Sequence, residues 1–235
     1  MQQALRDQFE QWGLPAQIRV DNGAPWGNWS DLPPPVVLWW LGLGIGVIWN
    51  HPHRPTENAK VERCHGTWYR WAEPAQCADA AAWSAQLAWA VQVQREEYPT
   101  VGGQSRLAAH PALTARPRPY GAAQEAAQWE LARVTTYLAQ GLWPRQVSQR
   151  GQISLYGQAY QVGGRHGGQP VWVRFDATER QWVVQGADGQ ELVRHAAEQI
   201  TAERICQLQV AKPHASSQKR RPNLPPQPAP ILYAA

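Results

Sequence analysis

The stretch RVDNGAPW (residues 19–26) is compatible with two different local structures. In one, Asp-Asn-Gly after a β-branched residue forms a tight hairpin turn, because Asn and Gly tolerate the positive φ angles that such a turn needs. In the other, residues 16–21 form a buried strand, and Asp21 stands at its end as a carboxylate that holds a metal ion. The sequence patterns on either side of this stretch are needed to decide between the two structures.

The flanking patterns predict a mixture of helices and strands. Residues 5–12 carry apolar side chains at i, i+4 and i+7, which is typical of one helical face, and Gly13 stops this helix. A proline triplet leads into a buried helix over residues 36–41, with proline in its first turn. Residues 44–50 are typical of the next buried strand. The front of the chain is therefore expected to be α/β.

Two further helices are expected after this strand. Thr56 is a good N-cap, so that a helix is expected over residues 57–71. Residues 78–97 repeat apolar side chains with helical spacing. A linker rich in Pro, Gly and Arg follows Tyr98, and residues 122–140 favour another helix.

The last third of the chain differs in character. Residues 145–193 form short alternating patterns broken by turn signals, which predict four or five strands in a small all-β barrel. The end of the chain is basic and rich in proline, and a disordered tail is expected there. The expected parts are an α/β part, a linker arm with a helix, the barrel and the tail, at residues 1–100, 101–143, 144–200 and 201–235.

Composition limits the class of protein. The 235 residues are 43% hydrophobic, which is enough to build a medium domain and a small one. The formal net charge of +4 favours an anionic partner such as nucleic acid. The longest apolar run, residues 36–49, contains three glycines and is too short to span a bilayer. No membrane partner is therefore expected.

The termini and cysteines indicate a compartment. No charged-then-apolar signal peptide follows Met1, so the chain is expected in the cytoplasm. Cys64, Cys77 and Cys206 are odd in number and scattered, which fits reduced thiols better than a disulfide framework.

If residues 16–21 form a strand, two carboxylates are candidates to bind a metal ion. Asp21 ends one strand, and Glu62 lies near the start of a helix that follows the next strand, 41 residues later. Because sites in open α/β sheets form at the carboxyl ends of strands, the two carboxylates are expected to approach one another. Carboxylate oxygens are ligands of Mg²⁺, together with phosphate oxygens and water. The pair predicts a metal site for phosphoryl transfer.

Polar side chains surround Glu62 on the same expected helix. Asn58 lies four residues before Glu62 and His65 three residues after it, so that all three share one helical face. Lys60 and Arg63 add positive charge nearby. We predict that Asn58, Lys60, Arg63 and His65 contact DNA.

The quoted residues also resemble a known family. DNGAPW, WWLGLGI (residues 39–45) and HPHRPTENAKVERCHGT (residues 51–67) look like the second half of the retroviral-integrase-type catalytic core of bacterial insertion-sequence transposases. The strand-rich segment GQISLYGQAYQVGGRHGGQPVWVRF (residues 151–175) is similar to the small C-terminal barrel of Mu-type transposases. The resemblance covers most of the chain.

The resemblance implies an activity and its ligands. Members of the family are Asp-Asp-Glu enzymes with a ribonuclease-H-like fold that use two metal ions, Mg²⁺ or Mn²⁺, to transfer DNA strands. Asp21 matches the second aspartate of the family, and Glu62 matches its glutamate. Glu57 falls before the Asn-x-Lys-Val-Glu-Arg core of the motif and is not expected to bind metal. The implied partners are transposon ends and target DNA.

The chain also departs from the family pattern. The first catalytic aspartate belongs on an earlier strand, and only twenty residues precede Asp21, so we expect a partial core without its N-terminal strands. Ala59 replaces the usual glycine. Two functions stay open: DNA strand transfer, or a catalytically inactive remnant that binds DNA or a transposase subunit. The expected partner is a second copy of the chain or a protein that supplies the missing N-terminal part.

Overall fold

The computed structural model describes residues 1–27, 31–51, 54–99 and 102–211. The chain divides into two compact units. Unit 1 combines Met1–Pro15 with Asn50–Ala122, and unit 2 combines Ala16–Trp49 with Ala123–Ala235. Both helices and strands are present, so the expected mixed α/β class is confirmed. The division differs from the expected order of parts, because residues 16–49 group with the C-terminal part of the chain.

Unit 1 is helical in its described residues. Its α-helices are α1 (Gln2–Trp12), α3 (Ala59–Trp71), α4 (Ala80–Glu96) and α5 (Arg106–Ala109), and its 3-10 helices are Pro55–Glu57, Pro74–Gln76 and Pro111–Thr114. The helix over residues 5–12 is confirmed, and Gly13 ends it at a φ of 81°. The helix over residues 78–97 is also confirmed, with Asp79 as N-cap accepting a hydrogen bond from the Ala82 amide at 2.8 Å.

The start of α3 differs from the expectation. Thr56 lies within the 3-10 helix Pro55–Glu57, and Asn58 is the N-cap of α3. The tighter turn of the 3-10 helix delays the first α-helical residue to Ala59. The expected N-cap at Thr56 is therefore wrong by two residues.

The two ends of unit 1 are joined over a long sequence separation. The Leu14 amide donates to the Arg118 carbonyl at 2.8 Å, and the Arg118 guanidinium donates to the Pro15 carbonyl at 2.8 Å. The rings of Phe9 and Tyr120 meet edge to face, with centroids 5.8 Å apart. These contacts hold α1 against the segment that the sequence indicates as a linker.

Unit 2 contains the strands. Its helices are α2 (Pro35–Gly42), α6 (Glu125–Gln128), α7 (Leu131–Ala139), α8 (Ala202–Cys206) and the 3-10 helix Gly164–His166, and a 3-10 helix at Ala122–Gln124 lies at its boundary. Its strands are β1 (Gln17–Val20), β2 (Gly46–Trp49), β3 (Leu142–Gln146), β4 (Gln152–Leu155), β5 (Gln158–Gln161), β6 (Pro170–Asp176), β7 (Gln181–Gln185) and β8 (Glu191–Ala196).

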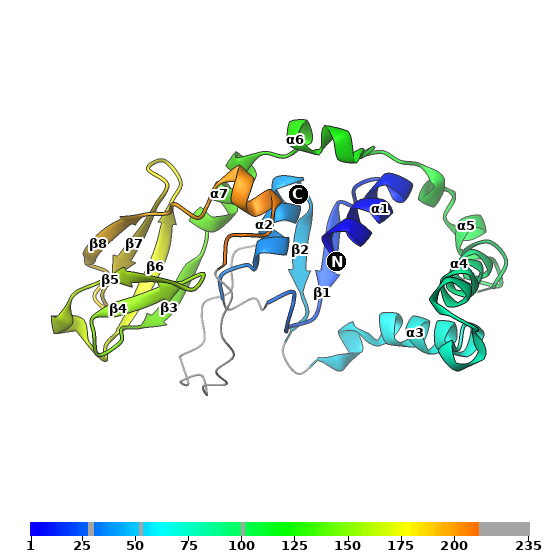
Figure 1. Cartoon of the computed structure of the whole chain (residues 1–235), viewed down its shortest axis with the longest axis horizontal. Coiled ribbons are helices and arrows are strands. Elements are labelled where there is room, and N and C mark those ends of the chain that lie inside the picture. The colour runs from blue at the N-terminus through cyan, green and yellow to red at the C-terminus, as the bar shows by residue number, and fades with distance from the viewer. Residues whose placement is uncertain (28–30, 52–53, 100–101, 212–235) are drawn as a thin grey trace. The chain divides into compact units, whose positions relative to one another are not determined.

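The pairing of strand β1 decides between the two local structures that residues 19–26 allow. It pairs in parallel with β2, with Gln17 opposite Gly46 and Val20 opposite Trp49. A two-residue hairpin joins antiparallel neighbours, whereas parallel strands need a crossover, which α2 provides here (Figure 1). The hairpin turn at Asp-Asn-Gly is therefore wrong, and Asp21 directly follows a strand.

Helix α2 is buried on all sides, as the apolar run predicts. Every residue of Val36–Gly42 is buried, and Pro34 and Pro35 begin the helix. The Trp129 indole packs directly on Gly42, where a Cβ atom would overlap it. Its Nε1 donates to the Trp39 carbonyl at 3.1 Å, and the Glu130 amide donates to the Gly42 carbonyl at 3.0 Å.

This contact breaks the helix expected over residues 122–140. Trp129 and Glu130 adopt extended backbone angles, so that α6 ends at Gln128 and α7 begins at Leu131. The hydrogen bonds of Trp129 and Glu130 to α2 replace those of a continuous helix. The single long helix is therefore wrong.

The C-terminal strands form two antiparallel sheets. One sheet has the order β3-β6-β7-β8, and β4 and β5 form a separate hairpin. Among the described residues, β3 pairs only with β6 and β8 only with β7, so the ladder does not close on itself. The described residues contain six strands here, β3 to β8, where four or five were expected, and the closed all-β barrel is wrong. Phe175 and Trp182 meet edge to face in the core of this part, with ring centroids 4.9 Å apart.

The residues after the sheet are more ordered than expected. Thr201 caps α8 by accepting a hydrogen bond from the Arg204 amide at 3.3 Å, and Ile205 and Val210 are buried. The expected disordered tail is therefore wrong for residues 201–211, and residues 212–235 lie outside the described residues.

Over the described ranges, no helix is both long enough and apolar enough to cross a membrane.

The packing of Trp129 on Gly42 generates a stability prediction. The substitution Gly42→Ala adds a methyl group where the indole lies, so we expect unfolding to become easier by about 1–3 kcal/mol. The corresponding fall in Tm is roughly 2–4 °C per kcal/mol, measured by thermal denaturation followed by circular dichroism.

The matched control is Gly66→Ala in α3, where nothing lies within 4 Å of the added Cβ. Because alanine favours a helix over glycine, this variant should keep or raise the Tm. A Gly42→Ala protein as stable as the Gly66→Ala protein would contradict the packing argument.

Candidate carboxylate site and nucleic-acid interface

Asp21 lies at the carboxyl end of β1, at the start of a loop fixed by tryptophans. The Trp26 ring stacks on the Trp40 ring of α2, with centroids 5.2 Å apart, and the Trp49 indole donates to the Trp26 carbonyl at 3.3 Å. Gly23 and Gly27 exchange backbone hydrogen bonds of 2.6 and 2.7 Å. The loop therefore packs on α2 and β2, while the Asp21 side chain is exposed.

The segment after this loop is tied to the C-terminal strands. The Arg145 guanidinium on β3 pairs with the Asp31 carboxylate at 2.7 Å, and the Tyr156 hydroxyl donates to the Pro33 carbonyl at 2.8 Å. Burial of this hydroxyl raises the pKa of Tyr156 well above its usual value, and the charge of Asp31 adds to the effect. These bonds fix the entry into α2, although no local sequence pattern indicates them.

Glu62 lies in the first turn of α3, and its side chain is exposed. Its amide donates to the Asn58 carbonyl at 3.0 Å, which closes the first turn of the helix. The partial positive charge of the helix N-terminus favours a carboxylate at this position. Among the described residues, the carboxylates of Glu62 and Asp21 make no hydrogen bond or ion pair, so their oxygens are available to a ligand.

Glu57 has a different environment. Its carboxylate accepts a hydrogen bond from the His51 amide at 2.9 Å and contacts the His51 ring Nδ1 at 2.7 Å. The side chain therefore closes the turn before α3. The choice of Glu62 over Glu57 as the candidate ligand stays a prediction.

The predicted DNA contacts on α3 fall into two groups. Lys60, Arg63 and His65 are exposed, so their side chains are available to a partner. Asn58 is half-buried, and its Oδ1 accepts a hydrogen bond from the Asn50 side chain at 3.3 Å. Asn58 therefore fixes the start of the helix, which leaves the three basic side chains as the better candidates.

Helix α3 has one supported side and one open side. The Cys64 thiol donates to the side-chain carbonyl of buried Gln94 on α4 at 3.2 Å, and the Trp71 carbonyl accepts from the Gln86 side chain at 3.0 Å. No residue of α3 is fully buried. The helix is held by α4 along the side that carries Cys64 and Trp71. Glu62 and His65, three residues apart, are exposed on another side of the helix.

The expected approach of the two carboxylates stays a prediction. Asp21 belongs to unit 2 and Glu62 to unit 1. By their oxygen chemistry both fit a hard divalent cation such as Mg²⁺. Within the part of the chain that the structure describes, no group of three or more His, Cys, Asp or Glu side chains is gathered to hold a metal ion.

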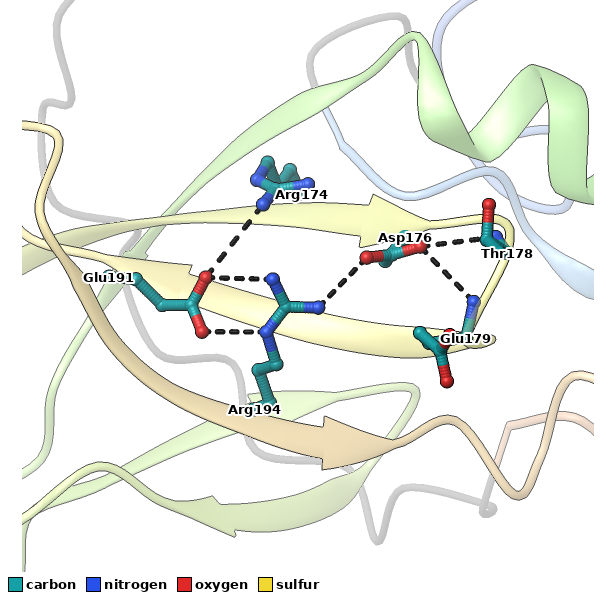
Figure 2. Close-up of polar contacts among 6 residues, drawn as sticks. All are labelled: Arg174, Asp176, Thr178, Glu179, Glu191 and Arg194. Atoms are coloured by element: carbon teal, nitrogen blue, oxygen red, sulfur yellow. Dashed lines mark hydrogen bonds and ion pairs between the residues drawn. The ribbon is translucent and has the colours of Figure 1, made fainter.

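A charged cluster that the sequence did not predict lies on the outer face of the four-stranded sheet (Figure 2). Arg194 binds Glu191 through two hydrogen bonds of 2.6 and 3.0 Å and binds Asp176 at 2.8 Å. Arg174 approaches Glu191 at 3.8 Å. Cross-strand register explains the cluster, because Arg174 and Arg194 both stand opposite Val183. This register depends on which strands pair, so a local sequence pattern carries little signal for it.

The cluster lowers the pKa values of both carboxyl groups. Hydrogen bonds from the Glu179 amide and from Arg194 hold the pKa of Asp176 below its usual range. The hydrogen bonds from Arg194 lower the pKa of Glu191 and, in return, the cluster raises the pKa of Arg194. The charges balance within the cluster, which makes it a stabilising feature of the sheet rather than a free binding surface.

No model of a known protein family matches the chain.

The cluster generates a pH-dependent stability prediction. Folding lowers the pKa values of the Asp176 and Glu191 carboxyl groups. The cluster therefore stabilises the folded chain at pH values above the unfolded pKa values, near 4, and this stabilisation is lost as the pH falls through the folded pKa values. We expect the double variant Asp176→Asn/Glu191→Gln to have a lower Tm than the unmodified chain at pH 7. The difference should shrink as the pH falls from 4 toward 2, as measured by thermal denaturation across this range.

The control is Glu179→Gln, which changes a neighbouring carboxylate that forms no ion pair with described residues. Its Tm should follow that of the unmodified chain at both pH values. A difference for the double variant that persists unchanged at pH 2 would show that the effect is not electrostatic.

Proposed function

We propose that this chain acts on DNA in transposition, as part of an integrase-type transposase with a ribonuclease-H-like core. Asp21 and Glu62 are two of the carboxylates that bind its metal ions, and the basic side chains of α3 contact the DNA. The observation that best supports this proposal is the position of Asp21 directly after β1. Strand β1 belongs to a parallel β1-α2-β2 motif, and the chain then leads to the helix of Glu62.

This order of elements supports the proposal in a specific way. The resemblance requires the second aspartate at the end of a strand and the glutamate on a helix after the next strand. Asp21 and Glu62 have these positions, and both carboxylates are exposed. A solvated turn residue would equally be exposed, but the hairpin that such a turn requires is not formed.

The chemistry follows from the residue types. Mg²⁺ or Mn²⁺, when bound, supplies stabilisation of charge on the attacking and leaving oxygens of the phosphodiester. Asp21 and Glu62 would hold the ions through carboxylate oxygens, each presented by a rigid element: a strand end packed on α2 and a helix packed on α4. Lys60 and Arg63 would hold the DNA backbone through its phosphates.

A second candidate function is DNA binding without catalysis. Its support is that the described residues gather no third carboxylate with Asp21 or Glu62. In this case the same basic side chains of α3 contact DNA, and the chain serves as a binding or subunit-interaction component of a transposase. The two functions share the DNA ligand and differ in whether Asp21 and Glu62 are needed.

The catalytic proposal predicts a pattern of variants. In a Mg²⁺-dependent strand-transfer assay, with the chain alone or supplemented by an integrase-type N-terminal segment, Asp21→Asn and Glu62→Gln should each reduce product to background. Each removes a carboxylate charge that would bind the metal. Glu57→Gln should retain activity, because that carboxylate is bonded to His51.

Equal loss of strand-transfer product in all three variants would contradict the assignment of Glu62 as a metal ligand. If the chain binds DNA but no condition gives Asp21-dependent product, the non-catalytic function is supported instead.

The interface on α3 makes a separate prediction about DNA affinity. The affinity for duplex DNA should fall steeply with salt, because each neutralised phosphate releases counterions. The variant Lys60→Gln/Arg63→Gln should lower the slope of log K against log salt by about 0.9 for each phosphate that is no longer neutralised, measured by fluorescence anisotropy. Arg180→Gln, an exposed arginine on the turn after β6, is the control and should leave the slope unchanged. An affinity for duplex DNA that does not change with salt concentration would contradict an interface with the DNA phosphates.

A further inference from the structure

Between Glu130 and Asp176 the chain contains no Asp or Glu, although it carries five arginines. Three of them have carboxylate partners from outside this segment: Arg133 pairs with Glu130, Arg145 with Asp31, and Arg174 with Glu191. The other two are Arg150 and Arg165. Both are exposed, and neither forms an ion pair with described residues. Their positive charge is therefore left unbalanced by any local carboxylate.

These two arginines lie in neighbouring loops, residues 147–151 and 162–169. The amides of Val162 and Gly163 both donate to the Gly151 carbonyl, at 2.7 and 3.1 Å. A Cβ at Gly151 would overlap the Gly163 carbonyl group, so glycine allows the two loops to approach this closely. We call the two loops together the basic loop pair.

The basic loop pair is held rigidly at both ends. Val147 and the end of the second loop exchange two backbone hydrogen bonds of 3.0 Å, one from the Val147 amide to the Gln169 carbonyl and one from the Gly168 amide to the Val147 carbonyl. The Gln161 side chain donates to the Arg150 carbonyl at 3.3 Å. A fixed backbone reduces the ordering cost when a ligand binds.

The side chains of the basic loop pair also have a defined arrangement. Arg165 donates from Nε to the His166 Nε2 at 3.0 Å, and the His166 Nδ1 contacts the Gln169 side-chain carbonyl at 3.2 Å. In the first of these bonds the Arg165 guanidinium is the donor and the His166 Nε2 is the acceptor. Arg165 keeps its remaining N–H groups for a partner.

The composition of the loops favours one kind of partner. Their exposed residues are polar or glycine, with Ser148, Gln149, Arg150, Arg165 and Gln169 among them. The centre of a protein interface is typically apolar and aromatic, whereas a DNA backbone is contacted by Arg, Gln, Ser and backbone N–H groups. These positively charged loops, whose exposed residues are polar or glycine, therefore fit a polyanion such as DNA.

We propose that the basic loop pair is a second nucleic-acid contact surface, which binds the phosphodiester backbone of duplex DNA through Arg150 and Arg165. It lies in unit 2 and is separate from the α3 interface in unit 1. The inference rests on the proposed function in taking DNA as the ligand. It requires no metal site and makes no use of Asp21 or Glu62.

The test measures duplex DNA binding by the full chain as a function of salt. Arg150→Gln/Arg165→Gln should weaken binding and lower the slope of log K against log salt by about 0.9 for each arginine. The loss of affinity between 50 and 200 mM salt should then be smaller by roughly tenfold. Arg150→Lys/Arg165→Lys keeps both charges and should retain most of the slope. Arg180→Gln is the matched single-charge control, and the Tm of each variant verifies folding.

The outcomes separate this inference from the proposed function. If Arg150→Gln/Arg165→Gln binds like the unmodified chain while Lys60→Gln/Arg63→Gln does not, the basic loop pair is not a DNA surface and the α3 interface stands. The reverse result supports the loop pair and contradicts the α3 interface. If the unmodified chain binds no duplex DNA, both are overturned. Loss of binding to anionic phosphatidylserine vesicles, with DNA binding unchanged, would assign the loops to a membrane instead.

Discussion

The burial of α2 on every side is the constraint on which the rest of unit 2 depends. An apolar helix of eight residues cannot stay in water, so it must be covered by β2, α7 and α8 together. The glycine at position 42 lets Trp129 and the following residue bond directly to the helix backbone. This single contact fixes the crossover between β1 and β2 and also the path of the chain into the C-terminal strands.

Charge in unit 2 is distributed in two contrasting ways. On the sheet face, Arg174 and Arg194 balance the charges of Asp176 and Glu191. In the basic loop pair, arginines stand without carboxylates on backbone held by glycine contacts. The first arrangement satisfies its own charges, and the second leaves charge available. A residue type alone does not determine its role, because pairing across strands decides which arginines remain free.

Local patterns predicted the elements that depend on nearby residues. The strand before Asp21, the proline-initiated α2 and the helix α4 follow from periodicity, proline geometry and capping. Features set by distant contacts were not predictable in this way. The break at Trp129 depends on α2, ninety residues earlier, and closure of the C-terminal strands depends on which edges meet. The exposure of Glu62 and the engagement of Glu57 with His51 likewise needed the three-dimensional structure, although the motif already favoured Glu62.

The path of the chain between units has a consequence for synthesis on the ribosome. Unit 1 begins with Met1–Pro15 but is completed only when residues 116–122 arrive, since Leu14 bonds to Arg118 and Glu10 bonds to Ala122. These contacts of α1 cannot form until more than a hundred further residues have been made, and during that interval Phe9 has no tertiary cover from Tyr120. Vectorial synthesis therefore leaves α1 without these contacts for the whole of that interval.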